Sequence, residues 1–150
     1  LEILAQLSET DVVVVPIGGG GLISGVLTAI KQSKPNVKVI GVEPETANDT
    51  YLSLKNGELT EIPVSTTIAD GLRAIKPGYL TFPVVQRYID DIVLVSDDDI
   101  KEAQLLVLER MKQLIEPSSA TTVAAAMHGK LHVKDKNVVC VLTGGNVDVR

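Results

Sequence analysis

The sequence predicts an α/β fold, with an open parallel sheet that carries helices on both faces. Four short runs rich in Val and Ile are apolar at every position rather than at every second one, which is typical of strands covered on both sides. Helical stretches separate these runs, as in β-α-β crossovers. Since 150 residues suffice for one domain and not for two ordinary ones, we interpret residues 1–150 as a single segment.

The expected strands cover residues 12–15, 37–42, 92–95 and 138–142, and the expected helices cover residues 22–31, 50–55, 100–114 and 119–128. Gly57 and Gly129 end two of these helices. Ser96 is the expected N-cap of the longest, followed by three aspartates that suit the positive end of the helix dipole. Residues 59–83 hold three prolines and little periodicity, so we expect them to follow the carboxyl edge of the strands, where open α/β sheets keep their sites.

Composition narrows the classes of function. A net charge of −5 and 3% aromatic residues argue against nucleic acid as a partner. The apolar runs have strand length and no segment resembles a signal peptide, so we expect a cytoplasmic protein without a membrane partner. Cys140, within an apolar run, is expected to be a small buried hydrophobe. Because the chain opens at Leu1 without a methionine, we expect a fragment of a longer protein.

A run of four glycines, Gly18 to Gly21, lies between the first strand and the first helix. Bare backbone N–H groups at a helix N-terminus form an anion cradle, and glycines let a phosphate approach closely. Four glycines cost conformational entropy that an ordinary flexible turn would not need. The spacing fits neither the dinucleotide fingerprint nor the Walker loop, although Glu43 stands about where a ribose-binding acid would fall. A nicotinamide dehydrogenase is therefore the weakest of the readings that we keep.

Five motifs occur in order along the chain: GGGGLISG at residues 18–25, GVEP at 41–44, TIADG at 67–71, ERMK with IEP at 109–117, and LTGGNVD at 142–148. Together they resemble the threonine dehydratase and serine racemase family, which are pyridoxal-phosphate enzymes of fold type II. The resemblance runs along essentially the whole chain. It implies that the chain is the C-terminal part of the large catalytic domain of such an enzyme.

The resemblance implies roles for particular residues. The backbone amides of Gly18, Gly19, Gly20, Gly21 and Leu22 would hold the phosphate of the cofactor. Thr143 would place its hydroxyl against the pyridine nitrogen, where the family usually has Ser. A neutral partner there weakens the ring as an electron sink, which favours elimination over transamination. A strand-ending Thr bonded to the backbone is the alternative interpretation.

Two further sets of residues follow from the resemblance. Glu43, Asp49 and the carbonyl of Ala47 would bind Mg²⁺, Ca²⁺ or Mn²⁺, whereas spacing alone suggests a solvated acidic turn. Asp70, Gly71 and Glu116 would lie near the substrate or the cofactor ring, although an Asp-Gly turn and a charge at a helix start are ordinary alternatives.

Some positions depart from the family pattern. The chain has Ser118-Ser119-Ala120-Thr121-Thr122 where the family more often continues with Thr-Ala-Gly or Gly-Ala-Gly, which puts close packing against the cofactor in question. His128 and His132 are interpreted as solvent-facing.

The chain lacks the family's Ser-Phe-Lys-x-Arg-Gly motif with the lysine that forms a Schiff base, and the Ser-x-Asn-His-Ala motif that holds the substrate carboxylate. Both precede Leu1 in the family's order, so we expect an upstream segment of the same protein to supply them.

The first hypothesis is a dehydratase, or ammonia-lyase, that converts serine or threonine to a 2-oxo acid and ammonia as a homodimer. This segment alone is expected to be inactive. A serine racemase is the close alternative, and a non-catalytic phosphate-binding module is the alternative from another class.

Overall fold

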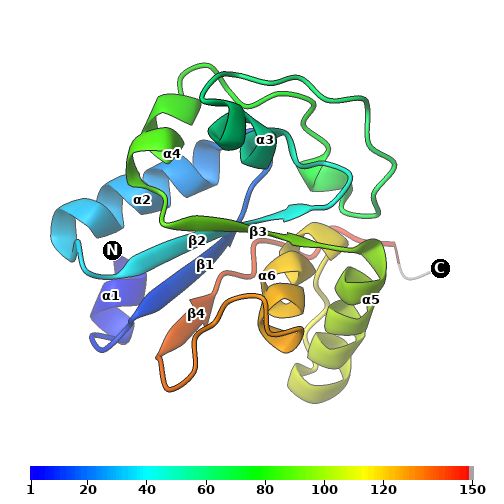
Figure 1. Cartoon of the computed structure of the whole chain (residues 1–150). Coiled ribbons are helices and arrows are strands. Elements are labelled where there is room, and N and C mark those ends of the chain that lie inside the picture. The colour runs from blue at the N-terminus through cyan, green and yellow to red at the C-terminus, as the bar shows by residue number, and fades with distance from the viewer. Residues whose placement is uncertain (149–150) are drawn as a thin grey trace.

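The computed structural model describes residues 1–148, and at their centre is a parallel sheet of four strands (Figure 1). Their order is β3 (Asp91–Val95), β2 (Lys38–Pro44), β1 (Val12–Pro16) and β4 (Val138–Cys140). In register, Val14 of β1 stands between Ile40 and Cys140. The predicted open parallel sheet is confirmed. The four predicted runs all form strands, although β4 ends at Cys140 rather than at residue 142.

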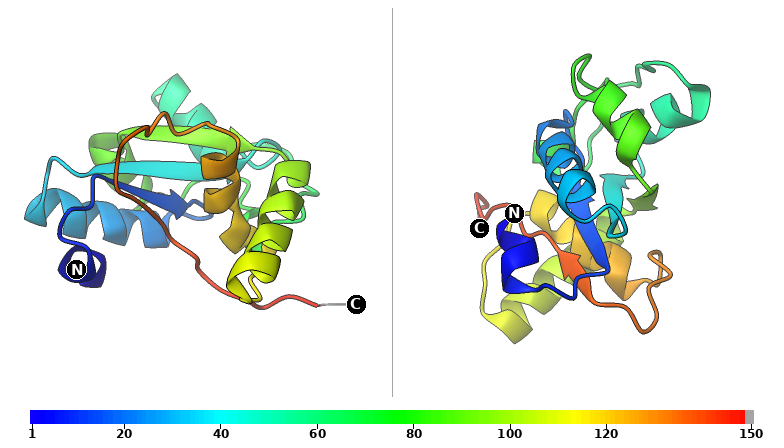
Figure 2. Two further views of the ribbon diagram at one scale, coloured as in Figure 1. Left: turned by 90° about the horizontal axis from the view of Figure 1, so that it is seen from below. Right: turned by 90° about the vertical axis from the view of Figure 1, so that its left-hand side faces the viewer.

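Helices cover both faces of the sheet, as Figure 2 shows. On one face α2 (Gly21–Ser33) and α4 (Phe82–Tyr88) pack against Val13 and Val15 of β1. On the other, α5 (Asp97–Leu106) and α6 (Pro117–Met127) pack against Val12 and Val14. Successive residues of a strand point to opposite faces, so β1 must be apolar at each of these positions. This two-sided burial explains the continuous apolar runs.

Two helices were not predicted, and one was predicted to begin and end too far along the chain. The short α1 (Glu2–Gln6) and α4 have few turns and give little periodic signal. The expected helix over residues 100–114 instead begins at Asp97, and its last turn is the π-helical η2 (Val107–Met111). Lys112 then adopts a left-handed conformation, with φ of 57°, which ends the helix. The apolar spacing in the sequence continues to Ile115, which is buried although it lies in the non-helical segment after the helix.

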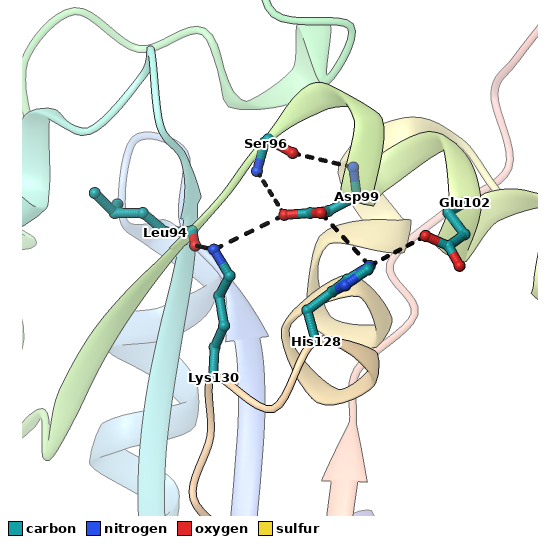
Figure 3. Close-up of polar contacts among 6 residues, drawn as sticks. All are labelled: Leu94, Ser96, Asp99, Glu102, His128 and Lys130. Atoms are coloured by element: carbon teal, nitrogen blue, oxygen red, sulfur yellow. Dashed lines mark hydrogen bonds and ion pairs between the residues drawn. The ribbon is translucent and has the colours of Figure 1, made fainter.

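A polar cluster ties the start of α5 to the end of α6 (Figure 3). Ser96 and Asp99 form the predicted cap, in which each side chain accepts a hydrogen bond from the other's backbone N–H, both at 3.1 Å. His128 Nε2 lies 3.5 Å from an oxygen of Asp99 and 3.3 Å from one of Glu102. Lys130 Nζ donates to the carbonyl of Leu94 at 2.8 Å.

The charges of this cluster act on Asp99. Burial acts to raise its pKa, but hydrogen bonds with Ser96 and the nearby His128 and Lys130 outweigh burial and lower the pKa. His128 is thus partly exposed, as predicted, and also faces two carboxylates that the sequence did not indicate. The cluster fixes α6, whose N-terminus carries residues of the candidate site.

The segment between α3 (Asp49–Asn56) and α4 contains one short helical turn, η1 (Asp70–Leu72). Asp97, at the start of α5, accepts hydrogen bonds from the hydroxyl of Thr67 and from the amide of Ile68. The carbonyl of Gly71 lies 3.1 Å from where a Cβ of Gly18 would stand, next to the end of β1. The segment therefore follows the carboxyl edge of the strands, as predicted.

Cys140 is half-buried rather than fully buried, because β4 pairs with β1 alone in the part of the chain that the structure describes. Burial nevertheless raises the pKa of its thiol, which suits an unreactive residue. Among residues 1–148, no helix combines the length and the apolar character that crossing a bilayer requires.

The same substitution at two glycines should change stability in opposite directions. In Gly41→Ala the new Cβ would stand 2.2 Å from Cδ1 of the buried Ile17, so we expect a loss of about 1–3 kcal/mol in the free energy of unfolding. In Gly25→Ala, within α2, the Cβ meets nothing within 4 Å, so we expect a gain of up to about 1 kcal/mol. Urea unfolding measures both, and a Gly41→Ala variant as stable as the parent would contradict the packing at β2.

Candidate functional site

The glycine loop, residues 18–21, connects β1 to α2 at the carboxyl edge of the sheet. Gly20 has φ of 92°, a conformation that L side chains rarely adopt, and it is the N-cap of α2. The amides of Gly18, Gly19 and Gly20 donate to no acceptor within residues 1–148. Gly21 and Leu22 begin the helix, where N–H groups lack partners in the preceding turn. The loop therefore presents a set of free donors.

These donors border a cavity of about 260 Å³. A Cβ added at Gly19 or Gly21 would meet nothing within 4 Å, so side chains there would project into open space. The lining comes from the end of β1, the start of α2, η1, and the segments around Glu116 and Thr143. The lining residues are Pro16, Gly18, Gly19, Gly20, Gly21, Leu22, Ile23, Gly71, Leu72, Glu116, Ser118 and Thr143. Every predicted cofactor residue thus borders one cavity.

The wall opposite the glycine loop is held by the N-terminus of α6. The hydroxyl of Ser119 accepts hydrogen bonds from the amides of Thr143 at 2.8 Å and Gly144 at 3.5 Å. Glu116, the N-cap of α6, donates its amide to the carbonyl of Gly144 at 3.0 Å. These bonds place the exposed Thr143 on the cavity, so the segment after β4 and the start of α6 form one unit.

Ser118 and Ser119 are the residues whose role sequence reasoning missed. Both are buried, and Ser118 accepts a hydrogen bond from the amide of Gly71 at 3.1 Å. A Cβ on Gly71 would stand 2.9 Å from the Ser118 hydroxyl, so the two segments pack closely. Instead of loosening the site, the two hydroxyls fasten the Gly71 and Thr143 segments to α6. The feature that marks their role is a polar side chain that is buried at the start of a helix. Burial cannot be read from a single sequence.

Asp70 and Gly71 differ in position although they are neighbours. Gly71 lines the cavity, whereas Asp70 is exposed and is not among the lining residues. An oxygen of the Asp70 carboxylate accepts the amide of Gly71 at 3.0 Å, which is the local Asp-Gly turn considered above. A direct role for Asp70 toward substrate or ring stays a prediction.

Glu43 and Asp49 form a buried acid pair rather than a solvated turn. Glu43 is 0% exposed, and Asp49 is 1% exposed. The Glu43 carboxylate accepts the amides of Thr50 at 3.1 Å and Tyr51 at 2.9 Å, at the start of α3. Asp49 Oδ2 and Thr50 Oγ1 are buried without a hydrogen-bond partner in the described part of the chain. Two acids and two unsatisfied oxygens in one buried place call for a proton, a water molecule or a cation among them.

The pKa values of both acids of the pair are also raised strongly. Burial and the neighbouring Asp49 charge raise the pKa of Glu43 from 4.5 to about 8, against hydrogen bonds from Tyr51 and Thr50 that act to lower it. Burial raises the pKa of Asp49 from 3.8 to about 6. Within residues 1–148, no three His, Cys, Asp or Glu side chains gather in a way that could hold a metal. A cation here would therefore also need the buried Ala47's carbonyl, or water.

The chain resembles known proteins in sequence and in fold. The family model described as pyridoxal-phosphate dependent enzyme matches residues 1–144, so the chain belongs to that family. It is 47% identical over 149 residues to L-threonine ammonia-lyase of Thermotoga maritima and 46% identical over 155 residues to serine racemase of Dictyostelium discoideum. The alignments cover 99% of this chain, but 37% and 47% of those two proteins.

The chain is also similar in fold to a solved structure. The processed form of threonine deaminase isoform 2 from Solanum lycopersicum superposes with a TM-score of 0.93 at 39% identity, covering 99% of this chain and 41% of that one. The chain thus spans less than half of these relatives. The family expected from the five motifs is confirmed.

The acid pair should make stability fall as pH rises. Between about pH 5 and 8 the folded state holds a proton on Glu43 that the unfolded chain has lost, so the free energy of unfolding should drop by about 1 kcal/mol per pH unit without divalent cations. Glu43→Gln removes the titration and should flatten the slope. The exposed Glu45→Gln is the control, and urea unfolding with a chelator present is the measurement. Parallel slopes for Glu43→Gln and the parent would contradict the buried acid.

Proposed function

We propose that residues 1–150 are the C-terminal part of the catalytic domain of a pyridoxal-phosphate-dependent threonine or serine ammonia-lyase. The observation that carries the proposal is one cavity that is lined both by the free amide donors of the glycine loop and by Thr143. Relatives named L-threonine ammonia-lyase or L-threonine dehydratase are 40–47% identical to the chain. The substrate class is a small hydroxy amino acid, serine or threonine, and the products are a 2-oxo acid and ammonia.

The residues present fit the cofactor. The amides of Gly18 to Leu22 would hold its phosphate, because free donors at a helix N-terminus favour an anion and glycines leave room for it. The hydroxyl of Thr143 would face the pyridine nitrogen. When bound, the cofactor withdraws electrons from the α-carbon of the amino acid. A neutral hydroxyl at the nitrogen moderates that withdrawal, which suits loss of a β-hydroxyl.

No lysine lines the described cavity, so the amine that carries the cofactor must come from another segment. We propose that a segment preceding these residues in the complete protein supplies it, together with the group that holds the substrate carboxylate. Gly71 and Glu116, which border the cavity, would lie near ring and substrate.

Serine racemase is the second candidate, because relatives with that name match the chain as well, at 46% and 45% identity. The described cavity would serve both reactions.

We also propose that the protein is a homodimer in the cytoplasm. Exposed apolar side chains at the end of α5 and beyond it support an interface there: Leu105, Leu108, Met111 and Leu114 are between 43% and 56% exposed.

We propose further that Glu43, Asp49 and the carbonyl of Ala47 bind Mg²⁺, Ca²⁺ or Mn²⁺. The unsatisfied Asp49 Oδ2 and the buried acid pair support this, since an oxygen-only set suits these ions and a cation would replace the proton that the folded state holds on Glu43. Its role would be to stabilise the end of β2 and the start of α3, away from the lining of the cavity.

The complete protein tests the function. With the cofactor bound, serine or threonine should yield 2-oxo acid and ammonia and should shift the visible absorption band. Formation of D-serine without 2-oxo acid would favour the racemase, and the absence of any visible band would favour a non-catalytic phosphate-binding module.

Gly19→Val should weaken binding of pyridoxal phosphate by about tenfold or more, which is about 1.4 kcal/mol. The added side chain would fill open space in front of the amides without displacing neighbours, so the fold should survive. Gly20→Val is a poorer test, because φ of 92° and a contact of 2.6 Å with Thr81 would strain it. Cofactor titration of the apo protein measures the effect, with Gly25→Ala as control. Undiminished affinity in Gly19→Val would remove the phosphate cradle.

Mg²⁺ or Ca²⁺ should raise the melting temperature of the protein, because an ion that binds the folded state alone stabilises it, by about 2.7 kcal/mol at 100 times Kd. Asp49→Ala should abolish the rise. Asp98→Ala, at a surface aspartate whose side chain is 94% exposed, should keep it. Thermal unfolding with and without the ion is the measurement, and a rise that persists in Asp49→Ala would place the ion elsewhere.

A further inference from the structure

Thr81 stands directly behind the glycine loop and outside the cavity. It is the N-cap residue of α4, partly buried, and is not among the cavity lining. Its hydroxyl donates to the carbonyl of Gly19 at 2.9 Å and lies 3.1 Å from the carbonyl of Gly78. The amide of Gly78 donates to the same Gly19 carbonyl at 3.2 Å. One loop carbonyl is thus held by two donors from a segment about 60 residues away.

These bonds fix the direction in which an amide points. In a trans peptide the C=O and the N–H point in opposite directions. Because the Gly19 carbonyl is turned toward Gly78 and Thr81, the amide of Gly20 is turned away from them, toward the cavity that Gly20 lines.

The next peptide is fixed in a similar way. The Gly20 carbonyl accepts the hydroxyl of Ser24 at 2.6 Å and its amide at 3.0 Å. The Ser24 hydroxyl also lies 3.3 Å from the carbonyl of Thr81, so the two holders of the loop touch each other.

The Thr81 hydroxyl is packed so closely that the two residues next to it, Gly20 and Gly78, must be glycine. A Cβ at Gly20 would stand 2.6 Å from Thr81 Oγ1, and a Cβ at Gly78 would stand 2.6 Å from the same atom and 2.9 Å from the Gly19 carbonyl. A loop of four glycines has the largest conformational freedom available to a chain, and it can bind tightly only if that freedom is removed before the ligand arrives.

We infer that Thr81 is a positioning residue, whose hydroxyl holds the Gly19 carbonyl so that the loop amides face the phosphate of the cofactor before it binds. The inference rests on the proposed cofactor site and adds a residue to it. Thr81 acts through the loop and touches neither cofactor nor substrate.

The test uses the complete protein, freed of cofactor and titrated with pyridoxal phosphate. Thr81→Val keeps the branched shape and removes the hydroxyl, so the dissociation constant should rise about five- to tenfold, as expected for one hydrogen bond. Thr81→Ser keeps the hydroxyl and should restore affinity to within about twofold. Thr28→Val is the matched control, because the Thr28 hydroxyl is exposed and bonds only within α2, to the carbonyl of Ser24.

Two readouts separate positioning from a general loss of stability. At saturating cofactor, kcat and KM for the amino acid should match those of the parent in Thr81→Val, and the ³¹P resonance of the bound phosphate should shift in Thr81→Val but not in Thr81→Ser. If Thr81→Val does not fold, Thr81→Ala carries the test, because it removes the same hydroxyl without adding an atom beside the Gly19 carbonyl and should weaken affinity likewise.

Equal cofactor affinity in Thr81→Val and the parent would overturn the inference. So would an equal loss in Thr81→Ser, or a fall in kcat with unchanged affinity. Failure of the parent itself to bind the cofactor would instead overturn the proposed function, and this inference with it.

Discussion

The site depends on a constraint of the glycine loop, which has no side chains with which to hold itself. Its shape is imposed from outside, by the Thr81 hydroxyl and the Gly78 amide on the Gly19 carbonyl and by Ser24 on the Gly20 carbonyl. The carbonyl of Gly71 closes in on Gly18 from another side. The bare backbone that admits a phosphate therefore needs segments far apart in the sequence to keep its amides aligned.

The wall of the cavity at the start of α6 is also held by other segments, here through buried hydroxyl groups. Ser118 and Ser119, at the start of α6, hold the backbone of Gly71 and of Thr143, and α6 is itself tied to α5 through His128 and Asp99. The chain of contacts from this polar cluster to the cavity passes through a rigid helix. Both walls are thus set by residues from other segments of the chain rather than by the loops that line them.

Much of this could be predicted from the sequence. The continuous apolar runs indicated the parallel sheet because burial on both faces leaves no position for a polar residue, and the glycine run stood where a strand meets a helix. The cap at Ser96 was predicted because it is local. Thr81 and Ser119 could not be found this way, since their partners are about 60 and 24 residues away and nothing local marks them. The buried state of Glu43 and Asp49 was missed for a related reason, because acids after a strand resemble a surface turn.

The pairing of β1 with β4 joins the two ends of the segment. Val12 lies beside Val138, and the amide of Asn137 donates to the Asp11 carboxylate at 2.8 Å. Contacts between residues so distant in sequence form late, because the loop-closure entropy must be overcome first. On a ribosome, β1 and the glycine loop emerge well before β4 and Thr143. The amide donors of the cavity are therefore made well before its Thr143 side, and the newborn chain has no complete pocket until the segment after β4 has been synthesised.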